Sequence, residues 1–174
     1  MKKKSIIFLF ALILSSCELK YTISEKQKLA NEIRIKAAIQ IKKEKNLTPA
    51  GTMGQMMHEI QILGLMFNYY QKLDLKKGRE MVIYAAQTLA DKINEEKKIH
   101  PYLSTCPFPP QKTEIELYLY NPDGSLLPPG ELSIVSLAYG IIKYEIEDPE
   151  TTYLKTIYQE TYEEALEKIN QNLK

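Results

Sequence analysis

Residues 114–124 read EIELYLYNPDG, and no other part of the chain indicates its secondary structure so clearly. Apolar residues alternate there with charged and aromatic ones, which is the period-two pattern of a strand with one buried face. The final letters NPDG are typical of a turn. We therefore expect a hairpin whose second strand runs over residues 132–146, where the alternation returns and Gly140 marks a bulge or bend. The expected inward-facing residues of the first strand are Ile115, Leu117 and Leu119.

Three segments around this hairpin have helical periodicity. Ser24 is expected to cap a helix whose apolar residues recur every four positions, and residues 46–51 end it. Asp74 is expected to cap a second helix, which stops before Pro101. Residues 148–150 read DPE and combine an N-cap, a proline and an acid, so they predict the start of a third helix.

Residues 52–70 have two interpretations. The methionines near residue 55 suit a short helical turn, and residues 59–70 suit a strand buried on both faces. A single continuous helix over residues 53–70 is the alternative. With the first interpretation the order is α-β-α-β-β-α. The sequence thus predicts an α+β fold of two layers, a small three-stranded sheet with helices packed on one face, in a single domain over residues 25–174.

The first residues have the organisation of an export signal. Three lysines precede nine apolar residues, which are too few to span a bilayer as a helix, and small residues follow. Residues 14–17 read LSSC and resemble the lipobox of bacterial lipoproteins. That resemblance implies that residues 1–16 are a signal peptide, that Cys17 carries lipid and that residues 17–24 are a tether. It places the protein on the extracytoplasmic face of the cell membrane or outer membrane, and Glu18 favours the outer membrane.

Charge and cysteine content exclude some classes of function. Without residues 1–16 the chain has 20 basic and 22 acidic residues, a formal net charge of −2, with no concentrated basic patch. A nucleic-acid partner is therefore not expected. If Cys17 carries lipid, Cys106 is the one remaining cysteine and no internal disulfide can form.

The residues that could carry chemistry are few. His58, His100 and Cys106 do not have the spacing of a zinc site, so we expect no metal and no cofactor. Our leading hypothesis is a non-catalytic envelope protein that binds another protein or a cell-wall component, with the membrane as a second partner through lipid on Cys17. The rival hypothesis is an anchored hydrolase that uses Cys106 and His100.

Twelve tyrosines and no tryptophan are the unusual feature of the composition. Tyr118 and Tyr120 are expected on the outward side of their strand, and Tyr139 near the middle of the next. An outward row of tyrosines can bind a ligand, because the ring supplies contact area while the hydroxyl stays hydrated. The simpler interpretation is that tyrosine forms strands well and shields a half-exposed face.

Two strings of the body resemble uncharacterised bacterial envelope proteins. They are residues 93–108, which include His100 and Pro101, and residues 160–165, which read ETYEEA. The similar region spans about residues 51–166. It implies no activity and no functional residue.

Overall fold

The computed structural model describes residues 23–171, which form one mixed six-stranded sheet with three α-helices. The strands lie in the sheet in chain order, from β1 to β6. The helices are α1 (Glu25–Lys45), α2 (Leu75–Glu95) and α3 (Tyr162–Gln171). The strands are β1 (Thr48–Gln55), β2 (Ile62–Tyr69), β3 (Thr113–Leu119), β4 (Leu132–Ala138), β5 (Ile141–Glu147) and β6 (Leu154–Thr161). Two short 3₁₀ helices, η1 (Lys97–Tyr102) and η2 (Pro110–Lys112), lie in the connection from α2 to β3.

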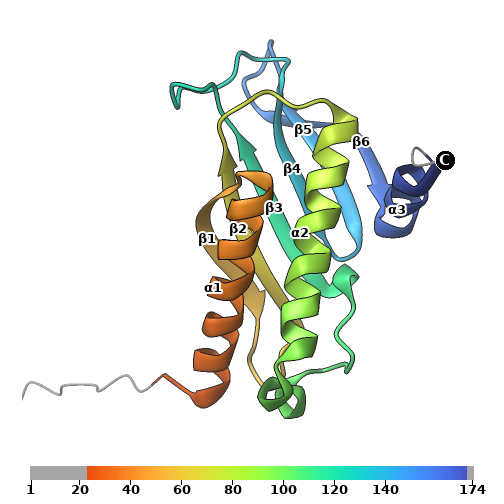
Figure 1. Cartoon of the computed structure of the whole chain (residues 1–174). Helices are drawn as coiled ribbons and strands as arrows, with labels where there is room; N and C mark the ends of the chain where they lie inside the picture. Colours follow the sequence, from red (N-terminus) through yellow and green to blue (C-terminus); the bar gives the residue numbers. More distant parts are fainter. Residues whose placement is uncertain (1–22, 172–174) are drawn as a thin grey trace, which may run out of the picture.

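The molecule has two layers. Helices α1 and α2 lie side by side over one face of the sheet, as Figure 1 shows, and α3 lies beside β6 at one edge. None of the three α-helices of the described chain covers the opposite face of the sheet, which we call the open face. The α+β class is therefore confirmed.

Local signals at the helix ends correctly predicted where α1 and α2 begin. The Ser24 hydroxyl accepts a hydrogen bond from the backbone N–H of Gln27, and the Asp74 carboxylate accepts one from the backbone N–H of Lys77. Asn46 ends α1 in the left-handed conformation, at φ 58°. These caps satisfy N–H groups that have no partner within the helix.

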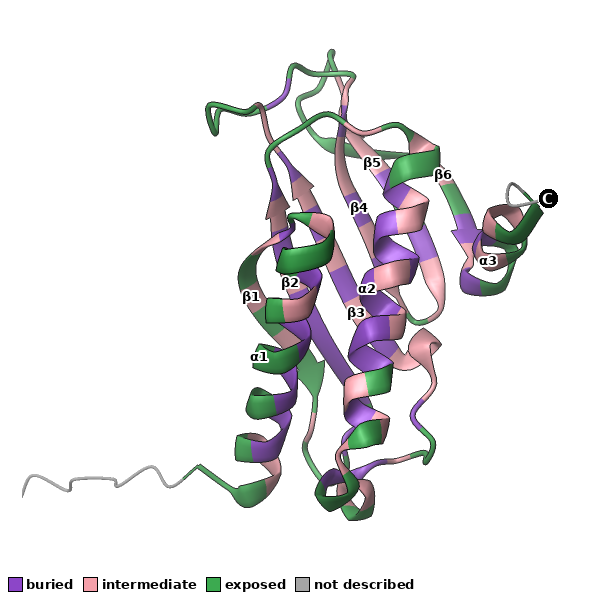
Figure 2. Ribbon diagram, in the orientation of Figure 1, coloured by how far each residue is buried: buried purple, intermediate pink, exposed green. Residues whose placement is uncertain are grey.

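The core lies between the two long helices and the sheet. Strands β2 and β3 are parallel and are joined across this face by α2, whereas every other neighbouring pair is antiparallel. Phe67, Leu117 and Val135 lie side by side on the helix-facing side of three strands and are fully buried. Figure 2 shows this buried layer along the sheet and along the facing sides of α1 and α2. The predicted strand over residues 59–70 and the predicted β3–β4 hairpin are both confirmed.

The prediction of a three-stranded sheet is wrong, and strand β1 is the first reason. Residues 46–51 were expected to be a loop and the next residues a short helix, but Thr48–Gln55 pairs with β2. The strand is rich in small residues, has a bulge between Pro49 and Gly51, and lies at an edge of the sheet. Most of its side chains are exposed or half-buried, so it has no apolar alternation to recognise.

The expected long strand over residues 132–146 is in fact two strands. Tyr139 and Gly140 both have positive φ, 51° and 75°, and form a two-residue turn that joins β4 to β5. Positive φ at both central residues is the geometry of a type I′ hairpin turn. Gly140 is therefore part of a turn, not of a bulge.

The helix expected from Asp148 is wrong for its first half. The Asp148 carboxylate does accept hydrogen bonds from the backbone N–H groups of Glu150 and Thr151, as an N-cap would. Thr152 then has a φ of 60°, and the chain continues as β6, which pairs with β5. Main-chain hydrogen bonds to β5 outweigh the local helical preference of these residues. Helix α3 begins only at Tyr162.

Candidate functional site

The β4–β5 turn holds an aromatic ring over the open face. Tyr139 is 70% exposed, although its φ is one that residues other than glycine rarely adopt. Asparagine is the usual residue at this place in a type I′ turn. A tyrosine held there costs about 1–3 kcal/mol of backbone strain.

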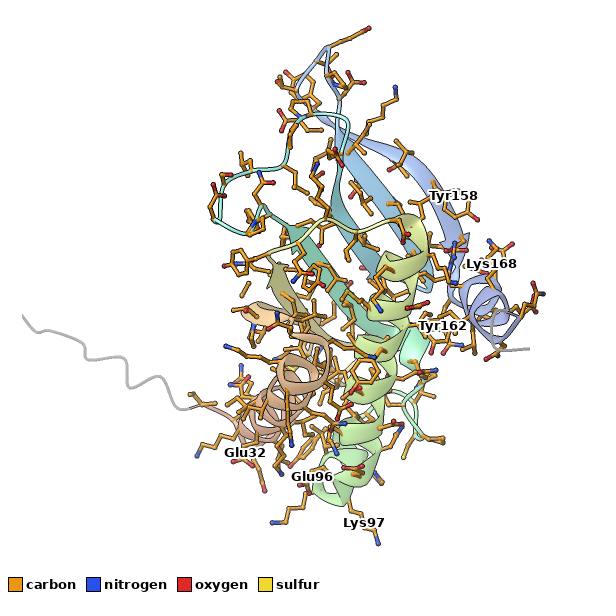
Figure 3. The ribbon with its side chains drawn as sticks, turned by 45° about the horizontal axis from the view of Figure 1, so that its top comes forward. Glu32, Glu96, Lys97, Tyr158, Tyr162 and Lys168 are labelled. Carbon is orange, nitrogen blue, oxygen red and sulfur yellow. The ribbon has the colours of Figure 1, made fainter. Side chains whose placement is uncertain are left out.

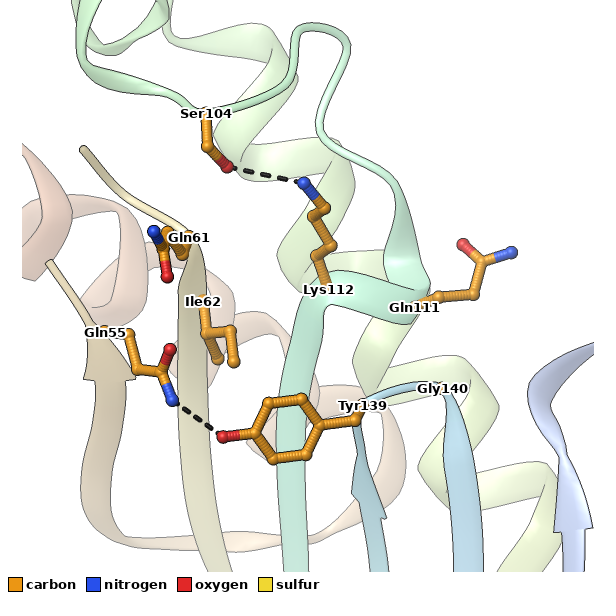
Figure 4. A pocket seen from close by; sticks show the side chains of 8 residues that line it. All are labelled: Gln55, Gln61, Ile62, Ser104, Gln111, Lys112, Tyr139 and Gly140. Atoms are coloured by element: carbon orange, nitrogen blue, oxygen red, sulfur yellow. Dashed lines mark hydrogen bonds between the residues drawn. The ribbon is translucent and has the colours of Figure 1, made fainter.

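The ring of Tyr139 lies across one end of a groove of about 490 Å³. In Figure 4 the ring extends in front of β3, with the helices behind the sheet, and its hydroxyl meets the side chain of Gln55 at the end of β1. The Gln55 Nε2 donates a hydrogen bond of 2.7 Å to that hydroxyl. We call this groove the Tyr139 groove; it is lined by Gln55, Gln61, Ile62, Ser104, Gln111, Lys112, Tyr139 and Gly140.

Main-chain pairing positions the wall of the Tyr139 groove that lies opposite β1, formed by the loop after η1 and by η2. Ile60 and Leu103 form an isolated bridge, and the Ser104 N–H donates to the Ile60 carbonyl at 3.1 Å. This pairing holds the loop after η1 against the start of β2. Ser104 and Lys112 therefore lie opposite Gln61, although they are distant from it in the sequence (Figure 4).

Lys112 is the cation of the Tyr139 groove. Its Nζ donates to the hydroxyl groups of Thr105, at 2.6 Å, and Ser104, at 3.4 Å. Within residues 23–171 it forms no ion pair with a carboxylate. The groove thus offers a positive charge, amide groups that can donate and accept, and an aromatic ring.

Acidic residues lie on the open face farther along β3. Burial, followed by the charge of Glu116, raises the pKa of Glu114. The hydrogen bond that Tyr118 donates to Glu116 is the largest cause that raises the pKa of Tyr118 to about 12. Glu114 and Glu116 thus place two carboxyl groups on the open face, and the Tyr118 hydroxyl donates to one of them.

A buried ion cluster lies at the other edge of the sheet, on the helix-facing side. Glu160 on β6 is 4% exposed, and its carboxylate accepts from Arg79 at 2.6 Å, Lys168 at 2.7 Å and Tyr144 at 2.5 Å. Figure 3 shows Lys168 of α3 and Tyr158 of β6 side by side at this place. Burial raises the pKa of Glu160, but the hydrogen bonds outweigh it, so the net pKa is lowered. Every oxygen of the carboxylate has a partner, which indicates that the cluster joins α2, β6 and α3 rather than binding a ligand.

The residues named by the rival hypothesis do not form a pair. The His100 Nε2 lies 3.1 Å from the Asn94 carbonyl oxygen, and Cys106 is an exposed free thiol. Neither is hydrogen-bonded to the other. His58 is exposed on the loop after β1. Over residues 23–171 no three side chains of the metal-binding types gather, and no helix is long and apolar enough to cross a bilayer.

The sequence patterns did not predict most residues of the Tyr139 groove. Cys17, the predicted site of lipid attachment, lies outside the described residues. The pattern predicts Tyr139 within a strand, and no motif includes Gln55, Gln61 or Lys112. The one signal present was Gly140 between two alternating apolar segments, since glycine is common in two-residue hairpin turns, but Tyr139 before it is not a usual turn residue. Comparisons with known protein families, with curated proteins and with solved structures gave no match.

Proposed function

We propose that the protein is a lipid-anchored extracytoplasmic lipoprotein that binds the saccharide chains of the cell wall in its Tyr139 groove, without catalysing a reaction. The conformation of Tyr139 is the observation that carries this proposal. A strained, exposed tyrosine at a turn where asparagine would fit without strain is best explained by a need for the ring.

The chemistry of the groove suits a sugar chain. Gln55 and Gln61 have amides that can donate to and accept from hydroxyl groups, and the Tyr139 ring can cover the apolar face of a sugar ring. Within residues 23–171 the Lys112 ammonium has only hydroxyl partners, which it could exchange for an acidic group on the saccharide. A groove of this volume is in the range of small-molecule sites.

Co-sedimentation with purified peptidoglycan sacculi tests the proposal. Tyr139→Asn should weaken binding about tenfold or more, because it removes the aromatic anchor. Its stability should be unchanged or higher: it relieves the turn strain but loses the hydrogen bond from Gln55, which contributes about 0.5–1.5 kcal/mol. A stable variant that no longer binds would separate loss of binding from loss of folding.

Tyr153→Asn is the matched control, since Tyr153 is an equally exposed tyrosine outside the Tyr139 groove. It should bind sacculi like the wild-type protein. The proposal is wrong if Tyr139→Asn binds normally, or if Tyr153→Asn reduces binding as strongly.

Lipid attachment at Cys17 is supported by the LSSC motif and its preceding apolar segment. Cys17→Ala should abolish incorporation of labelled palmitate and leave a precursor that keeps residues 1–16. Palmitate incorporation at the wild-type level in that variant would remove the basis of the anchor.

An anchored hydrolase that uses Cys106 and His100 stays a prediction. Cys106 is exposed, so a substrate could reach its thiol. Cys106→Ser would eliminate the activity of such an enzyme, whereas it should leave binding to sacculi unchanged.

A further inference from the structure

Arg34 is a buried arginine in the middle of α1. It is 5% exposed, and it points from the helix toward strand β1. One terminal nitrogen, Nη2, donates to the Met53 carbonyl oxygen at 2.5 Å, and Nη1 donates to the Asn31 side chain at 3.3 Å. Its Nε has no hydrogen-bond partner and no contact with solvent.

Among the side chains of residues 23–171, no carboxylate neutralises this charge. Within the described part of the chain Arg34 forms no ion pair, and burial lowers its pKa. A buried charge normally has a counter-ion, because removal from water is costly and the guanidinium cannot lose its proton near neutral pH. The buried carboxylate of Glu160, in the same molecule, has two such counter-ions, because Arg79 and Lys168 donate to it. Arg34 has no such counter-ion in the part of the chain that the structure describes.

A groove of about 460 Å³ leads to Arg34, between α1 and β1. We call it the Arg34 groove. Most of its lining is apolar, which suits a ligand with an apolar body and one anionic group. It is lined by Asn31, Arg34, Ile35, Ala38, Pro49, Ala50, Gly51, Thr52 and Leu65.

The wall of the Arg34 groove formed by β1 is an edge of the sheet. β1 pairs with β2 on one side, so the main-chain groups on its other side have no strand partner within the described sheet. Proteins protect such an edge with charged residues, proline or a bulge. β1 has no charged residue, and its proline and its bulge both lie at its first residues, between Pro49 and Gly51. Beside it, Ile35 and Ile39 of α1 are more than half exposed. An extended peptide could pair with this edge and place apolar side chains against α1.

We propose that the Arg34 groove binds the C-terminal end of an extended peptide, with its terminal carboxylate on Arg34, its main chain along β1 and an apolar last residue against Ile35. The three features agree on this occupant: an uncompensated guanidinium, a strand edge without charged residues and an apolar lining. The site is separate from the Tyr139 groove and does not depend on the saccharide proposal.

The test is an NMR titration of the ¹⁵N-labelled protein with acetyl-Ala-Val-Leu, as free acid and as carboxamide. The free acid should shift the Arg34 Nε–H signal and the backbone amides of β1, because a carboxylate in the groove would lie against the guanidinium and change its surroundings. The carboxamide should bind about 10- to 100-fold more weakly, the effect of losing one charge-assisted hydrogen bond.

Arg34→Met should reduce binding of the free acid to the level of the carboxamide and still fold, since an apolar side chain suits the buried position better than an uncompensated charge. Lys36→Met is the matched control, because it removes the same charge from an exposed position of α1 outside the groove. It should bind like the wild type.

Equal affinities for acid and carboxamide would overturn the proposal, as would binding that does not shift the amides of β1. A titration with octanoate distinguishes a peptide ligand from a free aliphatic acid. If octanoate binds as tightly as the peptide and shifts only Arg34, the ligand is a free acid and the peptide proposal is wrong. Binding of Arg34→Met to sacculi tests the Tyr139 groove independently.

Discussion

Glu160→Gln should destabilise the protein through the ion cluster at the β6 edge. Glutamine has the same shape as glutamate but carries no charge, so Arg79 and Lys168 lose their counter-ion. Arg79 has a side chain that is 11% exposed, and it therefore gains little solvation in return. Tyr144, which is fully buried, also loses a charged acceptor for its hydroxyl.

The size of the effect follows from the exposure of each partner. A hydrogen bond to a charged group contributes about 1.5–3 kcal/mol. The Arg79 and Tyr144 bonds are buried and count in this range, whereas the Lys168 bond adds little, because its side chain is 39% exposed and screened by water. Glutamine can still accept from one of these donors. We expect the free energy of unfolding at pH 7 to fall by about 2–4 kcal/mol, since a buried cation loses its partner.

The effect should depend on pH in one direction. The pKa of Glu160 is lowered in the folded state from its ordinary value of 4.5, because the three hydrogen bonds outweigh the opposing effect of burial. The stabilisation is thus fully present above about pH 4.5 and is lost as the pH falls through the folded-state pKa. The difference between the wild type and Glu160→Gln should shrink in acid.

Urea denaturation followed by circular dichroism, at pH 7 and in a series down to pH 3, measures both effects. Glu167→Gln is the control, because Glu167 is an exposed acid on the same helix as Lys168. It should change stability by less than about 0.5 kcal/mol. The reasoning is refuted if Glu160→Gln is as stable as this control at pH 7, or if its deficit does not decrease in acid.

Two other substitutions test the sheet itself. Phe67→Ala removes a fully buried ring from the helix-facing side of β2 and should cost about 3–5 kcal/mol in the free energy of unfolding, measured by the same urea denaturation. Gly64→Ala should cost about 1–3 kcal/mol, because a Cβ at Gly64 would lie 2.7 Å from the Glu114 carbonyl oxygen and would also meet Met53 on the open face. A Gly64→Ala variant of wild-type stability would contradict the close approach of β1 and β3 to β2 at this position.

Elements with a local signature were predictable from the sequence. Helices α1 and α2 have capping residues and a side that packs on the core, and β3 has a strict alternation. β2 is almost entirely buried, so its run of apolar residues was sufficient to indicate a strand. The buried side chains of α1, α2 and β3 repeat with the period of the backbone, and those of β2 form one continuous run.

Strand β6 shows how an edge position defeats this reasoning. Leu154, Ile157 and Tyr158 have the spacing of a helix face, which predicted a helix. Leu154 and Ile157 are in fact exposed, at 57% and 48%, so their spacing reflects no buried face. What holds the segment is main-chain pairing with β5 and the buried carboxylate of Glu160, and neither produces a periodic pattern.

The lack of a periodic apolar pattern in an edge strand also explains why the candidate sites could not be predicted from the sequence. Both grooves use β1: Gln55 lies at its end beside Tyr139, and Gly51 and Thr52 line the approach to Arg34. A strand with large apolar side chains would have been recognisable from its alternation, but it would have filled the space that a ligand needs. The small, uncharged residues that leave β1 without a sequence signature also leave its edge and both grooves accessible. An edge strand that lacks both a core-facing pattern and protective charge is therefore the place to look for binding in this fold.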